Sequence, residues 1–293
     1  MDQENTVIRD DYIDVTAGSE FLKMHYLQYE VENISNKNDL ICAHGISHNC
    51  RVFEYLAKEF VSKYRVTTPD FVGRGKSDWL EQKLLYHYQT YVPHSLELLD
   101  QLKINSADWL GTSMGGIIGI LIASIENSPI KRLVLNDIGP VISKLTMKLA
   151  QVVGNQRPVT FNTKEEVYDY FRPFKEAYGA HSDQIFFDIC DSLVIKNADG
   201  VLVSNYDPDI FAYTRDLPYF NDMEIGFWEY WQDVTCPVLL IHGENSIALT
   251  DDIISRMKET HNNIELVKIK NCGHAPHLMS QDHLLPIKEF LFN

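Results

Sequence analysis

Short apolar stretches alternate with helical patterns along most of this chain of 293 residues. This alternation constrains the fold more than any other feature. Apolar runs expected to be buried strands lie at residues 40–43, 64–68, 107–110, 133–135, 238–241 and 264–269. Between them apolar residues recur with a helical period, as at Val52, Leu56 and Phe60. Parallel strands need crossover connections of this kind, and a parallel sheet is covered on both faces. The sequence therefore predicts an α/β fold with a mostly parallel sheet.

Two further strands and several helices are expected around these parallel strands. The strands are expected at residues 11–16 and 22–30. The helices are expected at residues 51–63, 93–102, 117–125 and 251–261, with a last helix that reaches Phe292. Pro93 suits the first position of its helix, because a proline lacks the N–H that this position leaves unpaired. Asp251 and Asp252 suit a helix start, because carboxylates interact favourably with the positive end of the helix dipole.

Residues 141–232 interrupt the alternation. This segment is typical of helices at residues 141–153, 164–178 and 183–196, the second of them kinked or broken at Pro173. Its 92 residues hold 17 of the 33 aromatic residues of the chain, more than their share. An aromatic-rich helical insertion in an α/β sheet suits a lid over an apolar pocket. We therefore predict a core of residues 1–140 and 233–293 and a helical cap of residues 141–232.

The charge balance limits the partners of this chain. Acidic residues outnumber basic residues by 41 to 26, which gives a net charge of −15. Such a surface repels the phosphates of nucleic acids and of anionic membranes. We therefore expect a small-molecule substrate, with no nucleic acid and no membrane as a partner. No residue pattern indicates an oligomeric state.

The cysteines and the N-terminal residues indicate a compartment. The five cysteines are an odd number and include no Cys-x-x-Cys pair, so neither a disulfide framework nor a zinc site is expected. Residues 1–11 are charged and lack the apolar stretch of a signal peptide. The longest apolar runs, such as residues 117–123, are too short to span a bilayer. We expect a cytoplasmic protein in a reducing compartment.

The strongest chemical motif is Gly111-Thr112-Ser113-Met114-Gly115, which fits the pattern G-x-S-x-G. It follows an apolar strand and precedes an apolar helix, which is the context that a nucleophile elbow requires. In such a strained turn, side chains two residues to either side of the serine would collide with it. The motif therefore predicts that Ser113 is a nucleophile presented at the start of a helix.

A serine hydroxyl is a weak nucleophile and needs a base. His274 is the best candidate, because it follows the strand expected at residues 264–269. Sites in α/β sheets lie at the carboxyl ends of the strands. His242 and His277 are interpreted as structural or solvent-facing histidines.

Backbone N–H groups are expected to hold the oxyanion of the transition state. The turn at the nucleophile supplies the N–H of Met114. The loop after the strand at residues 40–43 contains His44-Gly45-Ile46, and the N–H of Ile46 is the second expected donor. Gly45 would allow the backbone to come close to the substrate.

Together these motifs resemble the α/β-hydrolase superfamily over nearly the whole chain. The resemblance is carried by His44-Gly45, Asp70 with Gly73-Arg74-Gly75-Lys76-Ser77-Asp78, Gly111–Gly116, Leu133–Pro140 and Gly273-His274. It implies an eight-stranded, mostly parallel sheet with a helical cap inserted after the sixth strand. It also implies a serine nucleophile, a histidine base and an acid that orients the histidine.

The acid is where this sequence departs from the family pattern. The family usually places an Asp three or four residues beyond a glycine like Gly243, where this chain has Ser246 and Ile247. Asp137 follows the sixth strand, where some relatives, including certain haloalkane dehalogenases, carry their acid. Glu244 lies in the usual loop at a different offset. Three alternatives therefore stay open: Asp137, Glu244, or no acid.

These features predict a serine hydrolase that cleaves a small, fairly apolar carboxylic ester, or a lactone or thioester, through an acyl-enzyme on Ser113. This mechanism needs neither a cofactor nor a metal. A serine at the elbow argues against epoxide hydrolase and haloalkane dehalogenase chemistry, because those relatives use an Asp nucleophile.

Two other functions compete with ester hydrolysis. The first is C–C bond hydrolysis of a ring-cleavage product, but relatives with that chemistry tend to carry a Trp after the histidine, and here Ala275 follows His274. The second is a non-catalytic binding protein on the hydrolase fold, which the irregular acid loop would fit. The intact serine, histidine and glycines weigh against it.

Overall fold

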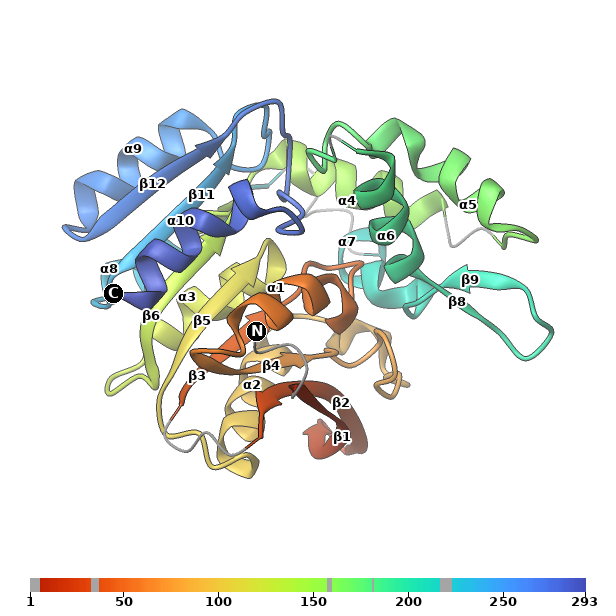
Figure 1. Cartoon of the computed structure of the whole chain (residues 1–293), viewed down its shortest axis with the longest axis horizontal. Coiled ribbons are helices and arrows are strands. Elements are labelled where there is room, and N and C mark those ends of the chain that lie inside the picture. The colour runs from red at the N-terminus through yellow and green to blue at the C-terminus, as the bar shows by residue number, and fades with distance from the viewer. Residues whose placement is uncertain (1–5, 33–36, 157–159, 181, 217–222) are drawn as a thin grey trace.

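An eight-stranded sheet is the centre of the computed structural model, which describes residues 6–32, 37–156, 160–180, 182–216 and 223–293 (Figure 1). Its strands are β1 (Thr6–Ala17), β2 (Glu20–Val31), β3 (Asn38–Ala43), β4 (Tyr64–Pro69), β5 (Ala107–Thr112), β6 (Ile130–Asn136), β11 (Val238–Gly243) and β12 (Ile264–Ile269). Their order across the sheet is β1-β2-β4-β3-β5-β6-β11-β12. β2 runs antiparallel to both β1 and β4, and the remaining pairs are parallel. The predicted fold class and sheet are confirmed. Residues 1–5, the start of the segment in which no signal peptide is expected, lie outside the described residues.

Helices cover both faces of this sheet. α1 (Glu54–Phe60) and α10 (Gln281–Phe292) pack on one face, and α2 (Tyr88–Gln101), α3 (Met114–Ala123), α8 (Trp228–Gln232) and α9 (Asp251–Thr260) pack on the other. The short helix η2 (Cys50–Phe53) precedes α1, and η3 (Lys83–Leu85) precedes α2. Neighbouring strand residues point to opposite faces. In β5, Trp109 therefore joins the core under α3, whereas Leu110 joins the core under α1 and α10.

The segment between β6 and β11 contributes no strand to this sheet, and apart from α8 its labelled elements lie on the right in Figure 1. Its elements are β7 (Val141–Ile142), α4 (Lys144–Gln156), α5 (Lys164–Phe171), η4 (Arg172–Phe174), α6 (Asp183–Leu193), β8 (Val194–Lys196), β9 (Leu202–Ser204), η5 (Pro208–Phe211), α7 (Ala212–Asp216), β10 (Ile225–Gly226) and α8. Several of its apolar residues, among them Val167, Phe186 and Ile189, form a core cluster of their own. The division into a core and a cap stays a prediction.

Two helices expected in this segment are partly strands. The helix expected from residue 141 begins three residues later as α4, because β7 pairs with β10. The helix expected at residues 183–196 ends where β8 begins. Val194 and Ile195 are β-branched and pair with β9, so tertiary pairing outweighs the helical pattern here. The break at Pro173 is confirmed, since α5 stops before it.

The start of α2 also differs from the expectation. The helix begins at Tyr88, so Pro93 lies inside it and the prediction of a first helical position for Pro93 is wrong. His87 caps this helix through its Nδ1, which accepts a hydrogen bond from the N–H of Gln89 at 3.1 Å. Histidine is not among the usual capping residues, which is why the sequence did not reveal the earlier start.

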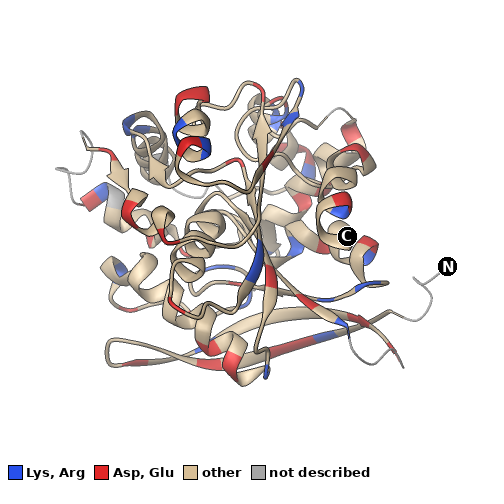
Figure 2. Ribbon diagram, turned by 90° about the vertical axis from the view of Figure 1, so that its left-hand side faces the viewer, with Lys and Arg blue, Asp and Glu red and all other residues tan. Residues whose placement is uncertain are grey.

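Charged residues of both signs are spread over the helices, strands and loops (Figure 2). No helix within the described ranges has the length and apolarity that crossing a membrane requires. The cytoplasmic location and the absence of nucleic acid and membrane partners remain predictions.

Candidate active site

Ser113 lies in the sharp turn between β5 and α3. Its φ of 51° is in the left-handed region, which a serine rarely adopts. The turn also brings backbones very close together. A Cβ on Gly111 would lie 2.3 Å from the carbonyl oxygen of Gly115, and a Cβ on Gly115 would lie 2.1 Å from that of Ala43. Only glycine fits at these two positions, but the atoms that exclude a side chain belong to Gly115 and Ala43 and not, as predicted, to the serine.

A chain of hydrogen bonds joins Ser113, His274 and Asp137. Nε2 of His274 lies 3.0 Å from Oγ of Ser113, and Nδ1 of the same ring lies 2.9 Å from Oδ2 of Asp137. The carboxylate is fully buried, whereas the imidazole is 31% exposed. A carboxylate only accepts, so it favours the proton on Nδ1 and leaves Nε2 free to accept the serine proton.

The carboxylate of Asp137 has three further donors. Oδ1 accepts from the N–H of Gly243 at 2.9 Å, and Oδ2 accepts from the N–H of Ala275 at 3.2 Å. Oγ of Ser246 donates to Oδ2 at 2.6 Å. Ser246 therefore occupies the usual position of the family's acid and binds the carboxylate that reaches the histidine from another strand.

These contacts keep Asp137 ionised. Burial raises the pKa of this carboxyl, but the neighbouring His242, His274 and Ser246 lower it more strongly, to about 2. Nδ1 of His242 lies 3.5 Å from Oδ1 of Asp137, which is long for a hydrogen bond. His242 thus stands beside the acid rather than at the reacting atoms.

Glu244, the alternative acid, points elsewhere. Its side chain is exposed, and Oε2 accepts a hydrogen bond from the N–H of Asn271 at 3.2 Å. Ile247 is 42% exposed. Of the two candidate carboxylates, the structure brings Asp137 to the histidine. His277 also lies apart from the serine: its Nδ1 accepts from the N–H of Met279.

The two expected oxyanion donors flank Ser113. Met114 is the first residue of α3, where a backbone N–H has no partner within the helix. A Cβ on Gly45 would lie 3.7 Å from Cβ of Ser113, so the loop that carries Ile46 passes beside the nucleophile. Ile46, Ser113 and Met114 all line the same cavity.

His44 holds this loop from behind. Its Nε2 accepts from the N–H of Phe71 at 3.1 Å, and its Nδ1 therefore carries the proton and donates to the carbonyl of Gly45 at 2.7 Å. Burial lowers the pKa of His44 to about 3, which keeps the ring neutral. The His44-Gly45 motif thus fixes the backbone just before Ile46.

Arg74 contacts the loop beside the serine, a contact that the sequence analysis did not predict. Its side chain is fully buried, and Nε donates to the carbonyl of Ile46 at 2.9 Å. Nη2 contacts Sδ of Met114 at 3.8 Å, and Nη1 donates to the hydroxyl of Tyr91 at 2.7 Å. Among the described residues, no carboxylate oxygen lies within 4.0 Å of this guanidinium. The sequence feature that could have indicated this role is the arginine within a Gly-x-Gly turn after a buried strand.

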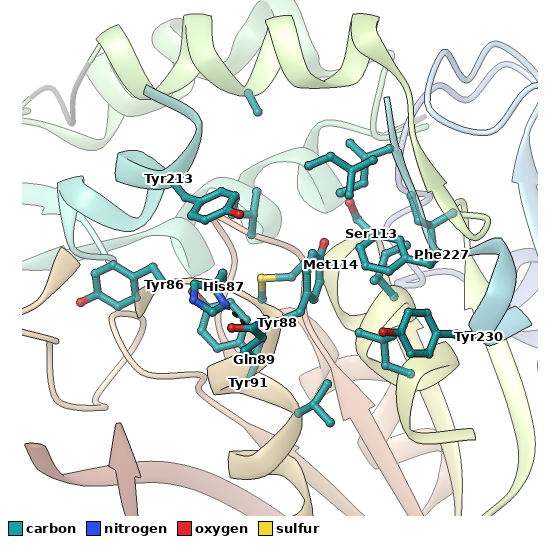
Figure 3. A pocket seen from close by; sticks show the side chains of 18 of the residues that line it. Tyr86, His87, Tyr88, Gln89, Tyr91, Ser113, Met114, Tyr213, Phe227 and Tyr230 are labelled. Carbon is teal, nitrogen blue, oxygen red and sulfur yellow. Dashed lines mark hydrogen bonds between the residues drawn. The ribbon is translucent and has the colours of Figure 1, made fainter. Parts of the chain in front are cut away.

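A large cavity opens beside the serine (Figure 3). Its volume is about 840 Å³, within the usual range for small-molecule sites. Tyr86 and Tyr213 lie on one side of Ser113, and Phe227 and Tyr230 lie on the other. The walls are mainly apolar and aromatic, which suits an apolar substrate.

One group of side chains has a spacing that a metal ion could use. Ligand atoms of His25, Cys50 and Asp70 lie within 4.8 Å of one another. The oxygens of Asp70 are already occupied, since they accept from the N–H of Cys50 at 2.6 Å and face Nδ1 of His25 at 2.7 Å. The N–H of Lys76 donates to the same carboxylate. The cluster therefore ties β2, β4 and the following turn together.

Comparison with known proteins identifies the family of this site. Residues 39–280 match the family described as alpha/beta hydrolase fold. A 3-hydroxybutyrate-oligomer hydrolase of Cupriavidus necator is 30% identical, over 86% of this chain and 88% of that protein. A 2-hydroxy-6-oxo-2,4-heptadienoate hydrolase of Pseudomonas putida is 22% identical, over 85% of this chain and 86% of that protein. The crystal structure of an alpha/beta hydrolase from Novosphingobium aromaticivorans superimposes with a TM-score of 0.85 at 25% identity, covering 97% of this chain and 98% of that one.

Proposed function

Because the chain belongs to the alpha/beta hydrolase family, we propose that it is a serine hydrolase that cleaves an apolar carboxylic ester, lactone or thioester. The observation that carries this proposal is the linked series Ser113–His274–Asp137 at the wall of an apolar cavity. A nucleophile, a base within hydrogen-bonding distance and a group that orients the base are the components of nucleophilic acyl transfer.

The reaction proceeds through an acyl-enzyme. Nε2 of His274 takes the proton of Ser113 as Oγ attacks the carbonyl carbon. The N–H groups of Ile46 and Met114 donate to the oxyanion that forms. As the ester bond breaks, His274 returns the proton to the leaving alkoxide. Water, deprotonated by the same nitrogen, then attacks the acyl group, and His274 returns the proton to Oγ of Ser113 as the acid is released.

Asp137 acts on the base and not on the substrate. With a pKa of about 2 it stays a carboxylate at neutral pH, so it stabilises the imidazolium that forms when His274 takes the proton. The hydrogen bonds from Gly243 and Ser246 hold this carboxylate in position.

The relatives support ester hydrolysis and also a second candidate. The named substrate of the Cupriavidus necator relative is an oligomer of a hydroxy acid, and a 21% identical relative from Nitrosospira multiformis is a methyl ester esterase. C–C bond hydrolysis is favoured by one observation, the similarity to the Pseudomonas putida hydrolase, whose named substrate is an oxo-dienoate. Ala275 after His274 weighs against it.

A direct comparison of substrates tests the proposal. Purified protein is incubated with p-nitrophenyl butyrate and, separately, with a 2-hydroxy-6-oxo-dienoate. We expect turnover of the ester and, after acid quenching, a butyryl adduct on the peptide that contains Ser113. Turnover of the dienoate with an inert ester would move the assignment to C–C hydrolysis. If folded protein turns over neither compound, the result favours the alternative of a non-catalytic binding protein.

A further inference from the structure

The cavity follows one face of α3 away from the nucleophile. Ser113, Ile117, Leu121, Ser124 and Ile125 all line it. From Ser113 to Ser124 successive positions are three or four residues apart, and Ile125 lies four residues after Leu121, so they form one stripe along the helix. Eleven residues separate Ser113 from Ser124, which corresponds to about 16 Å at roughly 1.5 Å per residue. The cavity is therefore much longer than a small acyl group requires.

This stripe leads from the interior to the solvent. Ile117 is fully buried, Leu121 and Ser124 are half-buried, and Ile125 is 42% exposed. At the outer end Tyr230 is 41% exposed. From the serine the cavity thus continues along α3 to an end that opens to the solvent.

Other helices enclose the stripe. α2 and α8 both contact α3, and α2 contributes Tyr88 and Val92 to the cavity wall. α4 contributes Thr146, Met147 and Ala150, which share one face of that helix. The walls that α2 and α4 contribute beside the stripe are therefore mainly apolar.

Resting on the proposed function, we propose that the cavity binds an extended, unbranched chain on one side of the scissile ester, laid along α3 from Ser113 to Ser124. An extended chain advances about 1.2 Å per bond, as three backbone bonds span roughly 3.6 Å. About 16 Å then accommodates about a dozen bonds. The substrate class is a linear long-chain ester, larger than the small ester that the sequence suggests.

Two chemical sources share this shape, an alkyl chain and a linear oligoester. Both present an extended chain to the apolar walls. The named substrate of the Cupriavidus necator relative is an oligomer, so oligomers of a hydroxy acid are tested beside alkyl esters of equal length.

The test measures kcat/KM against chain length on both sides of the ester. One series contains p-nitrophenyl acetate, butyrate, octanoate and dodecanoate, and the other contains alkyl acetates of the same lengths. In one of the two series we expect kcat/KM to rise about fourfold per buried methylene and to level off near a dozen bonds. A third series contains linear hydroxy-acid oligomers. Whichever of the oligomers and the alkyl esters of equal length gives the higher kcat/KM identifies the source of the chain.

Bulky substitutions along the stripe should shorten the accepted chain in order. In Leu121→Trp, kcat/KM is expected to stop rising at or below the octyl length. In Ser124→Trp it is expected to stop rising at a longer chain length. Val152→Trp is the matched control, since Val152 is 51% exposed on α4 and does not line the cavity. It should leave the profile of chain lengths unchanged.

Two results would overturn the inference. One is a wild-type protein that hydrolyses acetate but shows no rise with length in either series. The other is a rise that Leu121→Trp and Val152→Trp change equally. Failure of the proposed function gives a different result from these two. In that case no ester of any length, including the acetate, shows hydrolysis that depends on Ser113.

Discussion

Replacing Asp137 with Asn removes one negative charge. It also leaves a side-chain amide that can take either of two orientations. The carboxylate accepts four hydrogen bonds, from Gly243 on Oδ1 and from His274, Ser246 and Ala275 on Oδ2. An Asn side chain offers a single oxygen, so its NH₂ group must face donors on one of these two sides.

Each orientation disables the base in a different way. With NH₂ toward His274, Nδ1 must accept, the proton moves to Nε2, and Nε2 no longer takes the proton of Ser113. With NH₂ toward Gly243, two donors meet at 2.9 Å and the negative charge that stabilises the imidazolium is gone. The corresponding change in a serine protease lowers kcat about 10⁴-fold, which is about 5.4 kcal/mol of activation free energy. We expect a similar loss for Asp137→Asn.

The assay is hydrolysis of p-nitrophenyl butyrate under saturating conditions, together with the free energy of unfolding by urea. A buried donor without an acceptor should lower the unfolding free energy by about 1–3 kcal/mol, so the protein stays folded while kcat collapses. Glu244→Gln is the matched control, because that exposed side chain contacts Asn271 rather than His274. We expect no loss of kcat for the control, because this side chain contacts none of the three hydrogen-bonded groups Ser113, His274 and Asp137. Retention of kcat by Asp137→Asn within tenfold, or its loss in Glu244→Gln, would refute this reasoning.

Three further predictions follow from the same contacts. Arg74→Met should lower kcat by about 10- to 1,000-fold with little change in KM, because it releases the carbonyl of Ile46 and so misplaces an oxyanion donor. Asp137→Asn combined with Ser246→Asp should recover part of the lost turnover, since Oγ of Ser246 lies 2.6 Å from Oδ2 of Asp137 and a carboxylate there could reach His274. The pKa of Asp137 falls from 3.8 to about 2 on folding, so its stabilisation is complete above about pH 5 and is lost as the pH falls. Urea titrations from about pH 5 to about pH 2 should show wild type losing about 2 kcal/mol more than Asp137→Asn.

Each of these predictions has a matched control. Arg65→Met removes an arginine that pairs with Asp39 and does not line the cavity. If it lowers kcat as much as Arg74→Met does, the effect does not come from the oxyanion loop. Ser246→Asp alone should not exceed wild-type turnover. For the pH dependence, equal slopes in wild type and Asp137→Asn would contradict the lowered pKa.

The arrangement of the turn around Ser113 could be predicted because its constraints are local. The turn around Ser113 needs glycines at positions close in the chain, and the histidine follows a strand whose apolar pattern is plain. The same holds for the sheet, whose parallel strands are recognisable in the sequence as short apolar runs. Asp137 could be proposed from its place after β6 and preferred to Glu244, but the sequence alone did not exclude Glu244.

The remaining features depend on contacts between distant residues. Ser246 and Asp137 are 109 residues apart, and only the fold shows that the serine at the usual acid position donates a hydrogen bond to the carboxylate of Asp137. Arg74 acts on a loop 28 residues away. The length of the cavity arises from the packing of α2, α4 and α8 around α3, which no single segment of sequence encodes.

Covalent labelling by a fluorophosphonate, read by intact-protein mass, tests the central claim most directly. This probe reacts with an activated serine and requires no knowledge of the substrate. The account predicts a single adduct on wild type, none on Ser113→Ala, and much slower labelling of Asp137→Asn. Folded wild-type protein that forms no adduct, or a Ser113→Ala variant that is labelled as fast as wild type, would contradict it.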